Sequence, residues 1–182
     1  MSAIVIRQAG KEDAPLVLQF IKELAEYEHL SDSVAMTADI LADWIEQRKI
    51  EVLLAEYSGQ PAGFVLFYRV YATFRARPGL YIEDLFVMPE FRKRGIGTRL
   101  FCESARIAAE SNCCRIDWQV LHWNQKSIAF YEKLGGQPVS EWLTYRLTEE
   151  PLHRLAAAAA DEIVVSNSQK EQICRSSALP ED

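Results

Sequence analysis

The sequence predicts a mixed α/β (α+β) fold, in which a central sheet of six to seven strands is flanked by about four helices. Short alternating or apolar runs, typical of strands, are interleaved with stretches whose apolar residues recur every three to four positions, typical of helices. Turns that contain Gly or Pro separate these runs. The chain has 182 residues, which is about one ordinary domain with a sizeable core.

The N-terminal part predicts one strand and two helices. Residues Ala3–Arg7 alternate in polarity, as a half-buried strand does. The charged residues 11–13 open a helix that we expect to end near Tyr27. Thr37 has the hydroxyl group typical of the N-cap of a second helix. The apolar stripes of these helices are Leu16, Phe20, Ile21 and Leu24, then Ile40, Leu41, Trp44 and Ile45.

The middle of the chain predicts three strands and a long helix. Residues Glu51–Tyr57 and Ala62–Tyr71 read as strands joined by a turn at 58–61. Leu80–Met88 is a further apolar strand. The Gly95–Gly97 turn then begins a helix that runs to about Ser111.

The C-terminal part continues the alternation of strands and helices. Arg115–Leu121 reads as a strand, and Asn124–Leu134 as a short helix closed by two glycines. Val139–Leu147 is expected to supply one or two last strands. An alanine run predicts a helix up to residue 163, so that 1–163 form a single domain. Residues 164–182, rich in Ser, Gln, Lys, Glu and Pro, are expected to be a flexible tail.

Composition narrows the class of function. The net charge of −6 argues against a nucleic-acid-binding protein, which is normally basic, and favours small cationic substrates. No apolar run approaches the length of a membrane span, and we expect no leader before the first strand. The four cysteines lack the spacing of a zinc site, so we expect no metal and a reducing, cytoplasmic location.

The segment 81–110 joins an apolar strand to a helix through a basic, glycine-containing turn. Unpaired N–H groups at a helix start favour phosphate, and Arg92, Lys93 and Arg94 add positive charge. Neither a Walker loop nor a dinucleotide-binding fingerprint has this spacing. The pattern Arg-x-x-Gly-x-Gly by itself also fits an ordinary strand-helix connection.

Two linked motifs resemble the GCN5-related N-acetyltransferase (GNAT) superfamily. Arg92, Gly95 and Gly97 match its Arg/Gln-x-x-Gly-x-Gly/Ala signature, and Asn124 and Tyr131 match the asparagine and tyrosine of its fourth helix. The segments IRQAGKEDAPLVLQFIKELAEYE, YIEDLFVMPEFRKRGIG and WNQKSIAFYEKLG resemble the diamine (spermidine/spermine) acetyltransferase subgroup. The similarity extends from about Ile4 to Leu147.

This resemblance implies that acetyl-CoA binds where two strands splay apart. The strand backbone would pair with the pantetheine arm, and the turn and helix start would hold the pyrophosphate. Asn124 would orient the cofactor, although the residue by itself also fits a helix N-cap. The implied cofactor-binding residues are Leu85, Phe86, Val87, Arg92, Lys93, Arg94, Gly95, Ile96, Gly97, Thr98, Asn124 and Ser127.

The resemblance also implies the catalytic and acceptor residues. Tyr131 would be the acid beside the CoA sulfur, and Glu83 an amine ligand and a base that acts through water. Glu83 and Asp84 are adjacent on a strand, which places their side chains on opposite faces and excludes a carboxylate pair. The implied acceptor-binding residues are Tyr27, Glu28, Glu83, Asp117, Trp118 and Gln119.

We therefore expect an N-acetyltransferase that moves an acetyl group directly to a primary amine of a small diamine or polyamine, in a ternary complex. An alternative acceptor is a thialysine-like amino acid or another amine metabolite, since His122 stands where a polyamine enzyme often has a carboxylate. A non-catalytic acyl-CoA-binding module is the third hypothesis. By resemblance, we expect a homodimer.

Overall fold

The computed structural model describes residues 3–159, and the chain divides after Gly136 into two compact units. The first unit is built on one five-stranded sheet with the order β1-β2-β3-β4-β5. The first four strands pair antiparallel, and β5 runs parallel to β4. The mixed α/β fold is confirmed, with fewer strands than the six to seven predicted.

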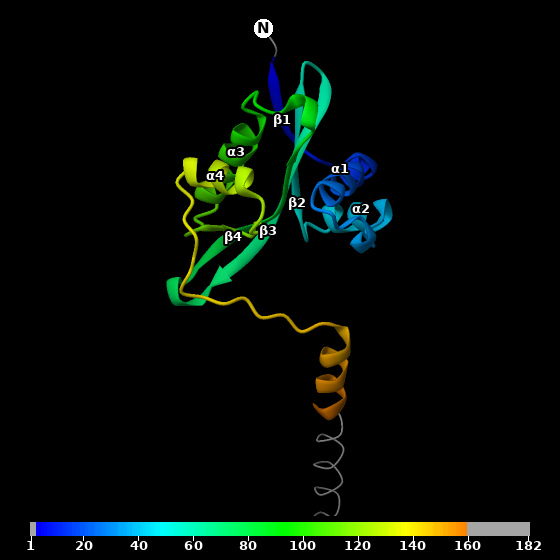
Figure 1. Ribbon diagram of the computed structural model, residues 1–182, viewed down its shortest axis with the longest axis vertical. Coiled ribbons are helices and arrows are strands. Elements are labelled where there is room, and N and C mark those ends of the chain that lie inside the picture. The colour runs from blue at the N-terminus through cyan, green and yellow to red at the C-terminus, as the bar shows by residue number, and fades with distance from the viewer. Residues whose placement is uncertain (1–2, 160–182) are drawn as a thin grey trace, which may run out of the picture. The chain divides into compact units, whose positions relative to one another are not determined.

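Helices cover both faces of this sheet (Figure 1). Helices α1 and α2 lie on one face, and α3 and α4 lie on the other. The strands are β1 (Ile4–Gln8), β2 (Glu51–Tyr57), β3 (Gln60–Ala72), β4 (Arg77–Val87) and β5 (Ile116–Trp118). The helices are α1 (Ala14–Tyr27), α2 (Ala38–Glu46), α3 (Ile96–Glu110) and α4 (Gln125–Lys133). Thr37 is the N-cap of α2, as predicted, because its hydroxyl accepts a hydrogen bond from the N–H of Ile40.

The core consists of two apolar clusters, one on each face of the sheet. Under α1 and α2, the rings of Phe20 and Phe64 stack with their centroids 5.6 Å apart. Under α3, Leu100 packs among buried residues of the central strands. Successive residues of β2 and β3 enter opposite clusters, because side chains alternate along a strand. Burial on both faces explains why these strands read as nearly continuous apolar runs.

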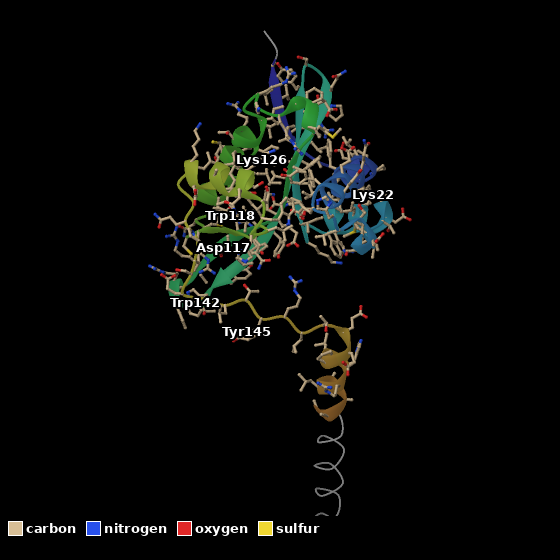
Figure 2. All side chains as sticks on the ribbon, in the orientation of Figure 1. Lys22, Asp117, Trp118, Lys126, Trp142 and Tyr145 are labelled. Carbon is tan, nitrogen blue, oxygen red and sulfur yellow. The ribbon has the colours of Figure 1, made fainter. Side chains whose placement is uncertain are left out.

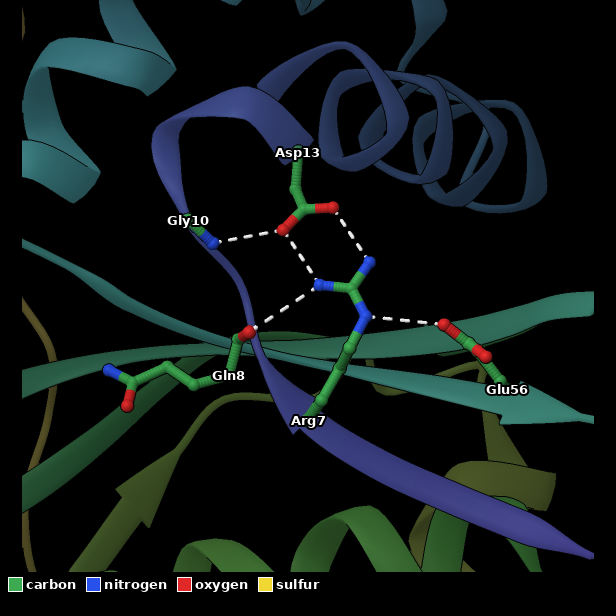
Figure 3. Close-up of polar contacts among 5 residues, drawn as sticks. All are labelled: Arg7, Gln8, Gly10, Asp13 and Glu56. Carbon is green, nitrogen blue, oxygen red and sulfur yellow. Dashed lines mark hydrogen bonds and ion pairs between the residues drawn. The ribbon is translucent and has the colours of Figure 1, made fainter. Parts of the chain in front are cut away.

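An ion-pair network fixes where α1 begins (Figure 3). The guanidinium of Arg7 on β1 donates two hydrogen bonds of 2.7 Å to the carboxylate of Asp13 and one of 3.2 Å to Glu56. Asp13 also accepts from the N–H of Gly10. The Arg7 contacts hold the pKa of the Asp13 carboxyl below its usual range. Such bidentate pairs add geometric specificity, so the network sets the position from which α1 runs toward Tyr27.

The prediction of one or two strands at Val139–Leu147 is wrong. Residues 137–148 contain no strand, and residues 149–159 form a helix. The alternation of side chains predicts which face of a strand is apolar, but a strand also needs a neighbour for its N–H and C=O groups. In the described sheet the last strand, β5, pairs only with β4. The expected tail at 164–182 lies outside the described residues.

Candidate functional site

The parallel pairing of β5 with β4 ends halfway along β4, and this point is called the divergence of β4 and β5 below. Their parallel pairing covers three positions and ends where Ile82 meets Trp118, which makes β5 shorter than the predicted Arg115–Leu121. Strand β4 continues to Val87 while paired with β3 alone. Within the described sheet, the β5-side edge of residues 83–87 therefore has no strand partner. The backbone of Leu85–Val87 lies along this open edge, where the family resemblance implies the pantetheine arm.

The loop after β4 leads into the exposed N-terminus of α3. Gly95 is its N-cap, has a φ of 84° and supplies no side-chain cap. The first helical hydrogen bond runs from the N–H of Arg99 to the carbonyl oxygen of Gly95. The N–H groups of Ile96, Gly97 and Thr98 therefore have no partner within the helix. These donors, with the positive end of the helix dipole, suit a phosphate group.

The three basic side chains of this loop differ in their contacts. Arg92 lies over the ring of Tyr27, with its Cζ 4.9 Å from the ring centroid. Arg94 lies at the same 4.9 Å over the ring of Tyr57 on β2. Lys93 is exposed and has no hydrogen bond or ion pair among residues 3–159. Of the three, Lys93 is the cation whose charge is available to a phosphate.

Asn124 connects α4 with the end of α1. Its side-chain oxygen caps α4 by accepting a hydrogen bond of 3.3 Å from the N–H of Ser127. The same oxygen accepts a hydrogen bond of 3.2 Å from the hydroxyl of Tyr27. Asn124 is 5% exposed, and the ring of Tyr27 also contacts Trp123 at 5.9 Å between centroids. Asn124 is thus an N-cap in this structure, and its contact with the cofactor stays a prediction.

Tyr131 is held by aromatic rings near the divergence of β4 and β5. Its centroid lies 4.9 Å from that of Trp118 and 6.0 Å from that of Phe101. Burial, with a smaller contribution from the negative charge of Glu28, raises the pKa of Tyr131 to about 12. The phenol is therefore protonated at neutral pH, as a proton or hydrogen-bond donor must be.

A β-bulge places Glu83 and Asp84 on the same face of the sheet, so the prediction that they face opposite sides is wrong. Leu66 faces Asp84 and the next residue, Phe67, faces Ile82, which leaves Glu83 as the extra residue. Asp84 shares the α1 side with Leu66. Glu83 turns to that side as well, since it accepts a hydrogen bond of 3.1 Å from Tyr68, whose neighbour Phe67 points toward α3.

Asp84 is a candidate site residue that the sequence alone does not indicate. Burial, followed by the negative charges of Glu83 and Glu28, raises the pKa of its carboxyl to about 7. Burial also raises the pKa of Glu28, which follows the last residue of α1. Three carboxyl groups from β4 and α1 therefore share one negative site on the α1 side of the sheet. The sequence carries no signal for the bulge that brings Asp84 into this group.

The three predicted acceptor residues around β5 differ in their contacts, and Figure 2 labels two of them, Asp117 and Trp118. Asp117 is paired with Arg115, whose Nε lies 2.6 Å from the Asp117 Oδ2. Trp118 packs edge-on against Phe101, with the ring centroids 5.3 Å apart. Its ring also contacts that of Tyr131. Gln119 lies just past the end of β5 and is exposed. Their contact with an acceptor stays a prediction.

Among residues 3–159, no group of three His, Cys, Asp or Glu side chains is arranged to hold a metal ion. In the same range, no helix combines the length and apolar character needed to cross a bilayer.

The model of the acetyltransferase (GNAT) family matches residues 17–136. The chain belongs to this family. The match spans both sequence motifs and the divergent strands, and it confirms the family assignment.

The chain is similar to proteins named as N-acetyltransferases and to a solved structure. It is 35% identical over 169 residues to the thialysine N-epsilon-acetyltransferase of Sus scrofa, covering 86% of this chain and 99% of that protein. It is 31% identical to the spermidine/spermine N(1)-acetyltransferase-like protein 1 of Homo sapiens, covering 86% of this chain but 24% of that protein. An integron cassette protein from V. cholerae is 26% identical with a TM-score of 0.70, covering 84% of this chain and 97% of that chain.

The family and these relatives make the chain an N-acetyltransferase that acts on amines. The relatives fit the alternative acceptor, a thialysine-like amino acid, at least as well as the diamine or polyamine expected first.

Proposed function

We propose that the chain transfers the acetyl group of acetyl-CoA to the terminal primary amine of a small, thialysine-like amino acid. The observation that carries this proposal is the group of carboxyls formed by Glu28, Glu83 and Asp84 on one face of β4. One compact negative site suits one ammonium group. The relative of Sus scrofa, matched over nearly its whole length, acts on such an amino acid by its name.

The surroundings of Asp117 favour an amino acid over a long polycation. Asp117 faces Tyr81 on β4, whose ring stacks on that of Tyr68 beside Glu83. A polyamine would need a free carboxylate for its distant ammonium group, but Asp117 is already paired with Arg115. Arg115 uses its Nε for Asp117, and the rest of its half-exposed guanidinium can donate to the carboxylate of an amino-acid acceptor.

The residues of the donor side fit an acyl-CoA. The open edge of β4 offers backbone groups to an extended amide chain, and the start of α3 offers N–H groups to a phosphate. A Cβ built on Gly95 would meet no atom within 4 Å, so a ligand has access to this backbone. Acetyl-CoA would supply the acetyl group as a thioester, and Leu85–Val87 and Lys93–Thr98 would hold it.

Direct transfer requires the acceptor amine to lose a proton. An alkyl ammonium with a pKa of about 10.4 is deprotonated at pH 7 at a cost of about 4–5 kcal/mol. Asp84, with its pKa of about 7, and Glu83 beside it are placed to bind the ammonium and to receive its proton. Because Tyr68 donates to Glu83, this carboxylate is oriented before the acceptor arrives.

Tyr131 stabilises the leaving sulfur by a hydrogen bond. A phenol with a pKa of about 12 is a weaker acid than a thiol with a pKa of about 8.5. Complete proton transfer to the thiolate is therefore uphill by about 3–4 pKa units, or about 5 kcal/mol. Tyr131 accordingly acts as a positioned donor whose proton moves toward the sulfur as negative charge develops there.

The test is turnover of an amine panel by the purified full chain. Thialysine, lysine, ornithine, putrescine and spermidine are each incubated with acetyl-CoA, and release of free CoA is measured. We expect kcat/KM to be at least tenfold higher for an amino acid than for either polyamine. A kcat/KM tenfold higher for spermidine or putrescine would instead support a diamine or polyamine as the acceptor.

The variant Asp84→Asn tests the assignment of the acceptor site, and Asp117→Asn is its matched control. Loss of the Asp117 charge, which Arg115 already offsets, should change acceptor KM less than loss of the Asp84 charge, which should raise acceptor KM about tenfold or more. Titration of the same variants with CoA in the absence of amine separates acceptor binding from donor binding.

We further propose that two copies of the chain form a homodimer through residues 139–147. The supporting observation is that this segment exposes large apolar side chains, including Trp142 at 75% and Tyr145 at 88% (Figure 2). Apolar groups gathered in this way are typical of interaction sites. Light scattering should give twice the monomer mass, and Trp142→Ser with Tyr145→Ser should give the monomer mass. A monomeric wild-type chain at micromolar concentration would contradict the proposal.

We also propose a cytoplasmic location. Cys102, Cys113 and Cys114 are free thiols in the described structure, as is usual in a reducing compartment. Fractionation of cells that express the full chain tests this, and recovery outside the cytosol would contradict it.

A further inference from the structure

We propose that Arg92 is a positioning residue for the acceptor site. Its side chain joins the cofactor loop to the end of α1 that carries Tyr27 and Glu28, instead of binding phosphate. This inference rests on the proposed function, because it assigns the acceptor site to that end of α1.

The contacts of Arg92 are with the end of β4 and the end of α1. Its Nε donates a hydrogen bond of 2.9 Å to the carbonyl of Val87, the last residue of β4. Its Cζ lies 4.9 Å from the ring centroid of Tyr27 and 5.5 Å from that of Phe86. One side chain therefore contacts the end of β4 and the end of α1 at the same time.

Tyr27 extends this connection to α4. Its ring lies under Arg92, while its hydroxyl donates to the side-chain oxygen of Asn124, the N-cap of α4. Arg92 thus contacts the face of the Tyr27 ring, and Asn124 accepts the hydrogen bond of its hydroxyl. The residue that follows Tyr27 is Glu28, one of the three acceptor carboxyls.

Arginine is required here because of its shape. A planar guanidinium can lie on an aromatic ring and donate from Nε in its own plane at the same time. A lysine keeps the charge but has no Nε donor and no plane to stack. Replacement of Arg92 by Lys should therefore leave the charge near the phosphates and release the end of α1.

Arg94 provides a matched comparison in the same loop. Its guanidinium lies at the same 4.9 Å over an aromatic ring, but that ring belongs to Tyr57 on β2. It also donates to the hydroxyl of Tyr57 at 3.2 Å. Tyr57 packs against the apolar cluster on the α3 side of the sheet, so Arg94→Lys loses the same kind of stacking contact on the face opposite Glu83 and Asp84.

The experiment compares Arg92→Lys with Arg94→Lys in the full chain. Acceptor KM is measured with the best amine of the panel, and the dissociation constant of CoA by calorimetric titration. We expect R92K to raise acceptor KM about tenfold while the CoA constant changes less than twofold. R94K should show the smaller change in acceptor KM. A change in the CoA constant that equals or exceeds the change in acceptor KM of R92K overturns the proposal.

A double-mutant cycle with Tyr27→Leu tests whether Arg92 acts through Tyr27. If it does, R92K combined with Y27L should raise acceptor KM no more than the larger single change. Independent, multiplicative effects would overturn the proposal. Melting temperatures of the same four proteins give a reading without any turnover. If the decreases in melting temperature are non-additive but no amine is acetylated, the proposed function is rejected, whereas the contact between Arg92 and Tyr27 is still supported.

Discussion

The hydroxyl of Tyr27 donates a hydrogen bond of 3.2 Å to the side-chain oxygen of Asn124, which lies 97 residues further along the chain. The bond joins the last residue of α1 to the N-cap of α4. Tyr27 precedes an acceptor carboxyl, and α4 carries Tyr131. One hydrogen bond therefore links the end of α1 beside the proposed acceptor site with the helix that carries the proposed donor, Tyr131.

Tyr27→Phe should weaken this connection and little else. The variant keeps the ring under Arg92 and beside Trp123, and it removes one hydrogen bond. We expect a decrease of about 1 kcal/mol in the free energy of unfolding and a rise of a few-fold in acceptor KM. Asn124→Ala also removes the helix cap, so it should cost more, about 1–3 kcal/mol. Denaturant titration measures both, and equal losses in the two variants would contradict this account.

Tyr131→Phe should lower kcat and leave stability nearly unchanged. The ring still packs on Trp118, so the variant removes only the hydroxyl. Loss of the donor to the leaving sulfur should reduce kcat about 10²-fold or more, with acceptor KM unchanged. Tyr71→Phe is a control, because Tyr71 is 77% exposed at the far end of β3. Comparable kcat values for the two variants would exclude Tyr131 from the chemistry.

Asp84→Asn should stabilise the protein at alkaline pH. The folded-state pKa of about 7 lies above the ordinary value of 3.8, so folding favours the protonated carboxyl. That contribution is fully present below about pH 4 and is lost as pH rises through 7. At pH 8 the variant should gain up to about 4 kcal/mol over the wild type, and near pH 4 nothing. Denaturant titration at the two pH values measures the gain, and a gain that does not depend on pH would contradict the raised pKa.

The same variant should lose activity where it gains stability. In the wild type, the acceptor KM should fall as pH rises from 6 to 8, because ionised Asp84 attracts the ammonium group. In Asp84→Asn this decrease should be absent. Steady-state kinetics over this range measures it, and parallel pH profiles for the two proteins would assign the dependence to another group.

Lys93→Gly should increase stability and weaken the binding of CoA. Lys93 has a φ of 61°, a left-handed conformation that glycine adopts without cost, so the change should add about 0.5–1 kcal/mol. Loss of its charge should raise the dissociation constant of CoA several-fold. Arg48→Gly is the matched control, since Arg48 has a φ of 53° in the turn after α2. Arg48→Gly should gain similar stability, and its dissociation constant for CoA should be unchanged. Equal dissociation constants for the two variants would show that Lys93 does not bind the phosphate.

The sequence by itself determined the family, the helices and the central strands. The spacing of Arg92, Gly95 and Gly97, with Asn124 and Tyr131 in order, indicated the family that the comparison confirms. Periodic side chains predicted α1 to α4, because the period of an element is a local property of the chain.

Only the tertiary structure decided how backbone groups are paired and which side chains meet. The missing strands at Val139–Leu147 depend on a neighbouring strand, which no local pattern specifies. The bulge at Glu83 depends on the register between β3 and β4, and it turns two adjacent carboxyls to one face. The contact of Arg92 with Tyr27 joins residues from separate elements. Pairing, register and long-range contacts are set by packing between elements. For that reason the sequence could not predict the place of Asp84 beside Glu83 or the orientation of Arg92.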